Sequence, residues 1–82
     1  MMINVSFFAM IREHLGCENI RLEYEGQHNI SDIKETLASR GEEWSILTGT
    51  TVLAAVNQTL CNDQHRVHDG DEIAFFPPVT GG

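Results

Sequence analysis

The chain has 82 residues, which is room for one small domain but not for two. Apolar residues make up 41% of it and charged residues 21%, a balance typical of a folded globular domain rather than a disordered one. Twelve acidic residues against five basic ones give a net charge of −7, which argues against nucleic-acid and anionic-membrane partners, since both are bound through lysine and arginine.

Neither a membrane span nor a secretory signal is expected. No apolar run approaches the ~20 residues that cross a bilayer, and residues 1–5 lack the basic and apolar regions of a signal peptide. Cys17 and Cys61 are too few for a disulfide scaffold, so each is expected to be a small, buried or half-buried hydrophobe. These features predict a cytoplasmic protein.

The first predicted element is a strand over residues 3–7, extended by Phe8 and Ala9. Apolar and polar residues alternate there, which is the pattern of a strand with one buried face. A short helical turn follows, with Ile11 and Leu15 on one face and Gly16 as its C-cap. The alternation resumes at residues 20–24, which are predicted to form a second strand that pairs with the first.

The main helix is predicted to begin at Ser31 and Asp32 and to end at Gly41. The Ser31 side chain can accept a hydrogen bond from a free N–H group, and Asp32 suits the positive end of the helix dipole. Ile33 and Leu37 form the apolar face at i, i+4 spacing.

Two further side chains in this region have predicted positions. Lys34, the chain's one lysine, is expected on the exposed face of the main helix. Trp44 falls in an irregular stretch after the helix, where a lone tryptophan is expected to close the end of the core rather than to bind a ligand.

The C-terminal half is predicted to be mostly strand. Residues 52–56 are wholly apolar, as in a central strand, and residues 57–59 turn the chain. A polar loop and a turn at 68–71 lead to the last strand, 72–76, which Pro77 and Pro78 end because proline cannot donate to the ladder. The fold class is therefore α+β, with one main helix packed on a small mixed sheet.

Several familiar sites are excluded or disfavoured. The glycines form neither of the two standard phosphate-binding patterns, so the chain is not expected to bind ATP itself. Two closely spaced pairs of residues are candidate metal ligands: His14 with Cys17, and His65 with His68. They could bind one metal ion together only by a coincidence of folding, so no metal site is predicted. Neither cysteine has a base nearby in sequence to activate it as a nucleophile.

The most informative feature is the terminal dipeptide Gly81-Gly82. Without side chains it can enter a slot too narrow for other residues, and it places a carboxylate at the tip of a flexible tail. That carboxylate is ionised near neutral pH, since its usual pKa is about 3.3–3.7, and another protein must activate it for acyl transfer. One interpretation is a carrier whose working atom is its own C-terminus; the alternative is a frayed, inert tail.

The residues before the glycines favour the carrier. Alternation along the last strand predicts that Phe75 faces the core and Phe76 contacts a partner. The two prolines stiffen the exit and so reduce the entropy lost when the tail enters a partner. Val79 and Thr80 then offer side chains for recognition, ahead of the thin tip.

These motifs resemble the MoaD-type family of small, sulfur-carrying subunits of molybdopterin synthase. The resemblance runs the length of the chain and is weakest between residues 18 and 51. It is carried by Phe7-Phe8-Ala9 with Arg12-Glu13 and Gly16, by residues 53–60, and by the ending Asp69–Gly82 with its Phe-Phe-Pro-Pro-Val-Thr-Gly-Gly sequence.

The resemblance implies a ubiquitin-like β-grasp fold over residues 1–76 and an extended reactive tail over residues 77–82. It implies that a MoeB-type activating enzyme uses ATP to adenylate the Gly82 carboxylate, and that sulfur then replaces AMP to give a thiocarboxylate. The tail would enter a MoaE-type large subunit and donate the sulfur to cyclic pyranopterin monophosphate in molybdenum cofactor biosynthesis. The residues that bind the partner would be Phe76, Pro77, Pro78, Val79, Thr80 and Gly81.

The same resemblance implies a heterotetramer with two carriers per large-subunit dimer, no bound cofactor or metal, and catalytic side chains supplied mainly by the large subunit. Three alternatives stay open: a sulfur carrier for thiamin synthesis or another thiolation pathway, a ubiquitin-like modifier joined to lysines of other proteins, and an interaction module with an inert tail.

Overall fold

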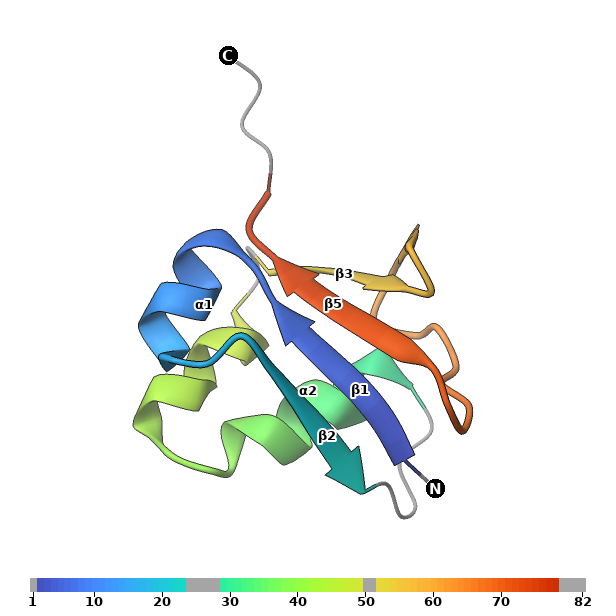
Figure 1. Cartoon of the computed structure of the whole chain (residues 1–82), viewed down its shortest axis with the longest axis horizontal. Coiled ribbons are helices and arrows are strands. Elements are labelled where there is room, and N and C mark those ends of the chain that lie inside the picture. The colour runs from blue at the N-terminus through green and yellow to red at the C-terminus, as the bar shows by residue number, and fades with distance from the viewer. Residues whose placement is uncertain (1, 24–28, 50–51, 79–82) are drawn as a thin grey trace.

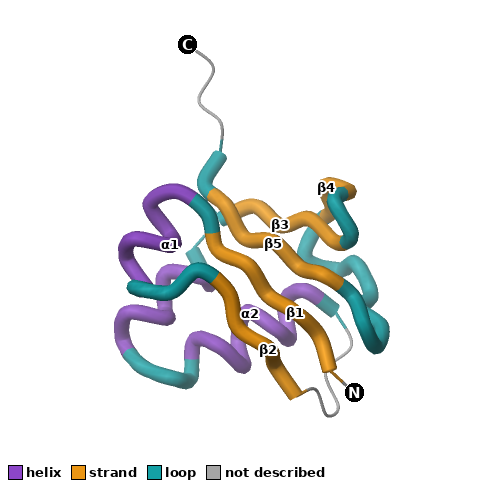
Figure 2. Tube along the Cα trace, viewed as in Figure 1, coloured by secondary structure: helices purple, strands orange, loops and turns teal. Residues whose placement is uncertain are grey.

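A computed structural model of the chain describes residues 2–23, 29–49 and 52–78. Within these ranges five strands form one sheet, accompanied by two α-helices and a 3₁₀ helix (Figure 1 and Figure 2). None of these helices is long and apolar enough to cross a membrane. The strands are β1 (Met2–Phe7), β2 (Asn19–Glu23), β3 (Leu53–Val56), β4 (Thr59–Cys61) and β5 (Glu72–Phe76). The helices are α1 (Ala9–Leu15), α2 (Ile30–Ala38) and the 3₁₀ helix η1 (Glu42–Thr48).

The sheet is mixed, with the strand order β2-β1-β5-β3-β4. β1 and β5 are parallel, and the other neighbouring pairs are antiparallel. In Figure 1, α2 passes behind β1 and β2, whereas the opposite face of the sheet points toward the viewer with no described helix over it. This is the predicted arrangement of a small mixed sheet on one main helix.

The core lies between the sheet and α2. Alternate side chains of β1 and β5 point into it with at most 1% exposure, and Ile33 and Leu37 of α2 meet them with none. Trp44 of η1 packs edge-on against Phe7, with ring centroids 5.6 Å apart, so it closes the core as predicted. The inward residues of the two strands are Ile3, Val5, Phe7, Ile73 and Phe75.

β1 is shorter than predicted because the backbone turns at Ala9. Phe8 is still extended, with φ −127° and ψ 154°. Ala9 has a φ of 54° and begins α1, so the prediction that the strand continues through it is wrong. A left-handed residue breaks the extended backbone that a strand requires. Gly16 ends α1 as predicted, with a φ of 68° and its N–H donating to the carbonyl of Arg12.

The N-cap of α2 is Asn29 rather than Ser31. The side chain of Asn29 accepts a hydrogen bond of 2.9 Å from the N–H of Asp32, whose carboxylate accepts one of 3.3 Å from the N–H of Asn29. This reciprocal pair is a capping box, and it leaves Ser31 within the first turn. The helix also ends earlier than predicted, at Ala38, and Gly41 instead precedes η1.

Replacing Asn29 with alanine is expected to cost about 1 kcal/mol of unfolding free energy, the typical loss for an N-cap side chain. For a domain of this size that lowers Tm by roughly 4–8 °C. Ser31→Ala is the matched control, with an expected change within about 0.5 kcal/mol because its side chain does not cap the helix. Urea unfolding of the three chains measures both effects, and equal losses in the two variants would contradict the capping assignment.

Lys34 is buried, contrary to its prediction. Its side chain is 6% exposed, and its Nζ lies 2.8 Å from Oδ1 of Asp63, in the segment that follows β4. The charge is tolerated there because an opposite charge and a hydrogen bond replace the water it loses.

β2, β3 and β5 lie close to their predicted positions, but β4 was not predicted, and Thr59, which was assigned to the turn, is its first residue. β3 and β4 form a hairpin, and its turn residues Asn57 and Gln58 have φ values of 50° and 70°. Positive φ at both central positions is the type I′ geometry that suits a two-residue hairpin. Gly70, with a φ of 85°, turns the chain before β5. β5 then runs between β1 and β3, so the C-terminal segment leaves from the interior of the sheet.

Candidate functional site

The described part of the tail begins at the end of β5. Phe75 is fully buried and its ring stacks on Phe7, with centroids 6.2 Å apart, whereas Phe76 points to the other face and is half-buried. This confirms the prediction that Phe75 belongs to the core. Pro77 is half-buried and Pro78 exposed. The predicted site residues Val79, Thr80, Gly81 and Gly82 lie outside the described residues.

Sheet register places two large apolar side chains beside Phe76. Leu53 of β3 is its partner across the antiparallel pair. On the other side, Phe7 is level with Phe75 in the parallel pair, so Phe8 comes next to Phe76. The N–H of Phe8 donates a hydrogen bond of 3.1 Å to the carbonyl of Phe75, which holds the two chains together there. Phe8 is 49% exposed.

A second row crosses the same face one step below the first. Ser6, Ala74, Ala55 and Leu60 are successive register partners across β1, β5, β3 and β4. The residues are small except at the end of the row, where Leu60 is 65% exposed. The two rows together leave a shallow apolar surface from which the larger side chains stand out.

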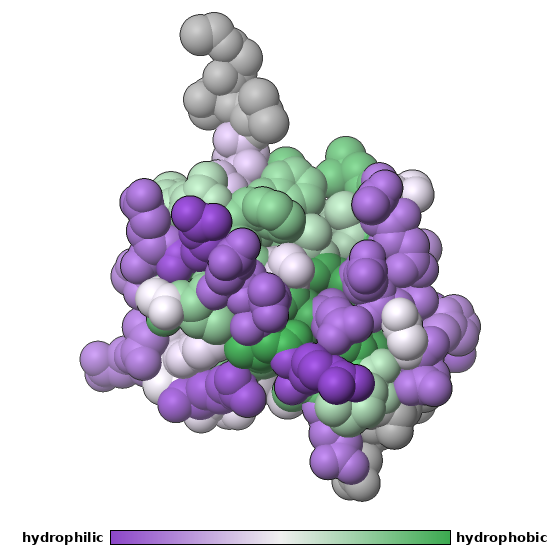
Figure 3. All heavy atoms as spheres, in the orientation of Figure 1, coloured by the Kyte–Doolittle hydropathy of each residue, from purple (hydrophilic) through white to green (hydrophobic). Residues whose placement is uncertain are grey.

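We call the apolar residues of these two rows the tail-base patch: Phe8, Leu53, Ala55, Leu60, Ala74 and Phe76. Figure 3 shows apolar surface gathered at this end of the uncovered sheet face, with polar residues below and beside it. The change in character is abrupt, because the following row contains Asn4 paired with Arg21 and Glu72. An exposed apolar patch with a polar border is typical of a protein-binding surface.

Sequence reasoning found Phe76 and missed Phe8 and Leu60 as members of this surface. For Phe8 the signal was present, since it follows inward-facing Phe7 and is extended, which sends it to the outer face. The signal for Leu60 was weaker, because the sequence around a single leucine beside a turn does not show which residues of other strands lie next to it. Its place depends on the pairing of β3 with both β4 and β5.

Among the described residues, the histidines and cysteines do not gather into a metal site. Within residues 2–23, 29–49 and 52–78, no group of three or more histidine, cysteine, aspartate or glutamate side chains is placed to hold a metal ion. Cys17 and Cys61 are both half-buried free thiols, as predicted. Burial raises the pKa of the Cys61 thiol, and the nearby Asp63 carboxylate raises it further, which keeps the thiol protonated and poorly nucleophilic.

Sequence comparisons give a consistent family. A model described as the ThiS family matches residues 5–82. The chain is 46% identical over 82 residues to the molybdopterin synthase sulfur carrier subunit of Haemophilus influenzae, which covers 99% of this chain and 100% of that protein. It is 42% identical, with the same coverage, to the protein of that name from Escherichia coli.

Structural comparisons agree on the fold. SAMP1 from Haloferax volcanii superposes with a TM-score of 0.82 over the whole of both chains, at 21% identity. A chain from the complex of subunits 1 and 2 of molybdopterin-converting factor from Helicobacter pylori superposes with a TM-score of 0.71, at 30% identity and with all of both chains covered. The predicted ubiquitin-like β-grasp fold is confirmed.

Proposed function

This chain belongs to the ThiS family, and we propose that within it the chain is the sulfur carrier subunit of a molybdopterin synthase. One observation carries the proposal: the chain leaves the sheet at Phe76, within the tail-base patch, and the sequence runs on from there to Gly81-Gly82. A carrier needs both parts together, because the patch would dock the partner that the reactive tail then enters. The relatives from Haemophilus influenzae and Escherichia coli, which match over their full lengths, support the same assignment.

The proposed chemistry takes place at Gly82. Its carboxylate would attack ATP on a MoeB-type activating enzyme and form an acyl adenylate with loss of pyrophosphate. A sulfur donor would then displace AMP, converting the adenylate to a thiocarboxylate. The thiocarboxylate is a far better nucleophile than a carboxylate, and in the large subunit it would donate its sulfur to cyclic pyranopterin monophosphate. The carrier itself needs no bound cofactor, since ATP is used by the activating enzyme.

Binding to a MoaE-type large subunit would bury the tail-base patch. The Helicobacter pylori relative occurs in a complex of subunits 1 and 2, which supports a partner of this kind, and two carriers on a large-subunit dimer would give the proposed heterotetramer. The net charge of −7 would steer the carrier toward a basic partner surface. Pro77 and Pro78 would limit the conformations of the tail before it enters, and enclosure in the partner would protect the thiocarboxylate from water. The use of ATP supports a cytoplasmic location.

The experiment that tests this function offers the sulfur-loaded chain two acceptor systems. One contains the large subunit of molybdopterin synthase with cyclic pyranopterin monophosphate, and the other contains the thiazole-forming enzyme of thiamin synthesis with its substrates. We expect loss of the thiocarboxylate and formation of the dithiolene in the first system only. Sulfur loss in the second alone would make the chain a thiamin carrier, and conjugates to other proteins that resist reducing agents would make it a modifier.

A further inference from the structure

The arginines and the lysine of this chain differ in their exposure to solvent. The four arginines, Arg12, Arg21, Arg40 and Arg66, are all exposed, whereas the one lysine, Lys34, is 5% exposed. An arginine guanidinium stays protonated in proteins and is a very poor acyl acceptor. A lysine amine accepts acyl groups once it has lost its proton. The chain therefore presents positive charge to solvent without presenting a lysine amine.

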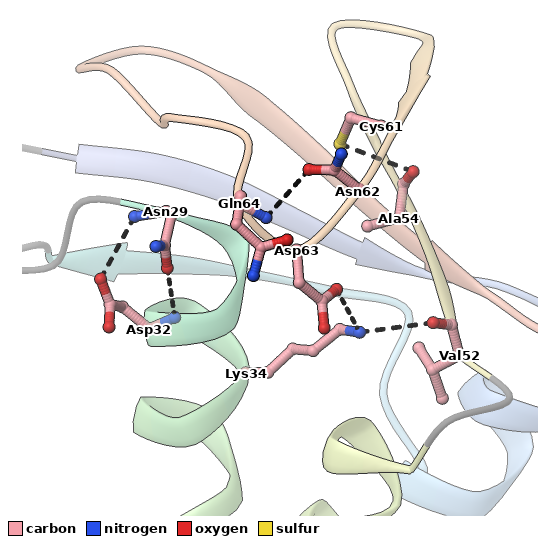
Figure 4. A network of polar contacts seen from close by, with 9 residues as sticks. All are labelled: Asn29, Asp32, Lys34, Val52, Ala54, Cys61, Asn62, Asp63 and Gln64. Atoms are coloured by element: carbon pink, nitrogen blue, oxygen red, sulfur yellow. Dashed lines mark hydrogen bonds and ion pairs between the residues drawn. The ribbon is translucent and has the colours of Figure 1, made fainter.

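Two acceptors hold the amine of Lys34. In Figure 4 its side chain extends from α2 toward Asp63 and Val52. Nζ donates to Oδ1 of Asp63 at 2.8 Å and to the carbonyl of Val52 at 3.3 Å. Asp63 is itself positioned by α2, because its carbonyl accepts a hydrogen bond of 2.9 Å from the N–H of Ser31. The helix that carries the lysine thus also fixes the segment that carries the carboxylate.

Distance from solvent does not by itself protect this amine. Lys34 and Asp63 line a cleft of about 410 Å³ that opens to solvent. The residues that line the rest of it are Gly49, Val52, Leu53, Ala54, Cys61, Asn62 and Gln64. A small acyl group could enter a cleft of this size, where two hydrogen bonds hold Nζ.

The importance of a withheld amine rests on the proposed function, in which Gly82 becomes an acyl adenylate. An acyl adenylate at Gly82 reacts with amines as well as with sulfur: the nitrogen lone pair forms a C–N bond to the acyl carbon, the C–O bond to AMP breaks, AMP leaves, and the nitrogen loses a proton to solvent. The product is an isopeptide, which cannot carry sulfur. An exposed lysine on a neighbouring copy would consume the carrier in this way.

We propose that Asp63, with the carbonyl of Val52, determines the fate of the activated terminus by withholding the chain's one lysine amine from acylation. The exposed cationic residues are arginines, which do not accept acyl groups. Asp63 does not touch the reacting atoms; it is a positioning residue that suppresses acylation of Lys34, so that the Gly82 adenylate reacts with sulfur instead.

The first part of the test needs no enzyme and measures acylation by an amine-reactive acetyl ester. Acetylation of Lys34 in the native chain should be about 10- to 100-fold slower than that of the amine introduced by Arg66→Lys, the factor expected when one charge-assisted hydrogen bond must first break. Asp63→Ala should remove most of that difference. Lys34→Arg supplies the blank, and peptide mapping scores the α-amino group separately. If Lys34 of the native chain is acetylated as fast as the lysine introduced by Arg66→Lys, the proposal is overturned, even if Asp63→Ala fails to fold.

The second part uses the activating enzyme and ATP without a sulfur donor. We expect pyrophosphate release from the native chain, which reports adenylation, with no isopeptide between Gly82 and Lys34. In Arg66→Lys we expect a Gly82 isopeptide at position 66, with release of AMP as the new C–N bond forms. An isopeptide at Lys34 in the native chain, or none in Arg66→Lys despite pyrophosphate release, contradicts the proposal. Absence of pyrophosphate release would instead count against the proposed function, and the acetylation rates would still decide the role of Asp63.

Discussion

A chain that ends at Gly81 is expected to lose sulfur loading while keeping its fold. The new terminal carboxyl group has the same chemistry, but it is set back by about 3.5 Å, the length of one extended residue. A misplacement of about 1 Å can already cost on the order of 100-fold in rate, so loading should fall at least that far. Among the residues that the structure describes, the last fully buried side chain is Phe75, well before the deletion, and stability should therefore be unchanged.

The measurement is the ATP-dependent gain in intact mass, with urea unfolding to report the fold. Deletion of Met1 is the matched control, since it shortens the chain by the same one residue at the opposite end. Normal loading of the chain that ends at Gly81 would show that the activated group is elsewhere and would refute the carrier mechanism.

Leu60→Ser is expected to weaken binding to the large subunit by roughly tenfold without weakening the fold. Leu60 is 65% exposed in the free chain, so little burial is lost there. If the partner covers it, serine forfeits most of the burial energy of a leucine side chain, about 1.5–3 kcal/mol when complete. Titration calorimetry with the large subunit measures the loss of affinity.

Met2→Ser is the control for Leu60→Ser. Met2 is also an exposed apolar residue, 37% accessible, but it lies at the opposite end of β1 from the residues that border Phe76. Its replacement should leave affinity unchanged. A similar loss in both variants would mean that the tail-base patch has no special part in binding, whereas no loss in Leu60→Ser would place the partner elsewhere.

Local patterns predicted the elements of this fold well. The alternation in residues 3–7 and 72–76 located β1 and β5 and the faces that their side chains occupy, because strand periodicity converts sequence directly into inward and outward positions. The same rule separated Phe75 from Phe76. Gly16 was identified as a C-cap because its left-handed conformation suits glycine.

Features that depend on distant residues could not be read locally. Lys34 has the spacing of an exposed helical residue, and its burial depends on Asp63, 29 residues later. Ser31 and Asn29 are both competent caps, and the choice between them was made by the reciprocal bond to Asp32. The tail-base patch combines residues from β3, β4 and β5 with Phe8, the residue after β1, so it exists only once the strand order is known.

If Gly82 carries sulfur, the intact mass of the native chain must change when the chain is loaded. The chain is weighed before and after incubation with ATP, a MoeB-type activating enzyme and a sulfur donor. We expect a gain equal to the replacement of one oxygen by sulfur, mapped to Gly82. An unchanged mass, with the same enzyme shown to load another carrier, would refute the carrier mechanism and leave a binding domain with an inert tail.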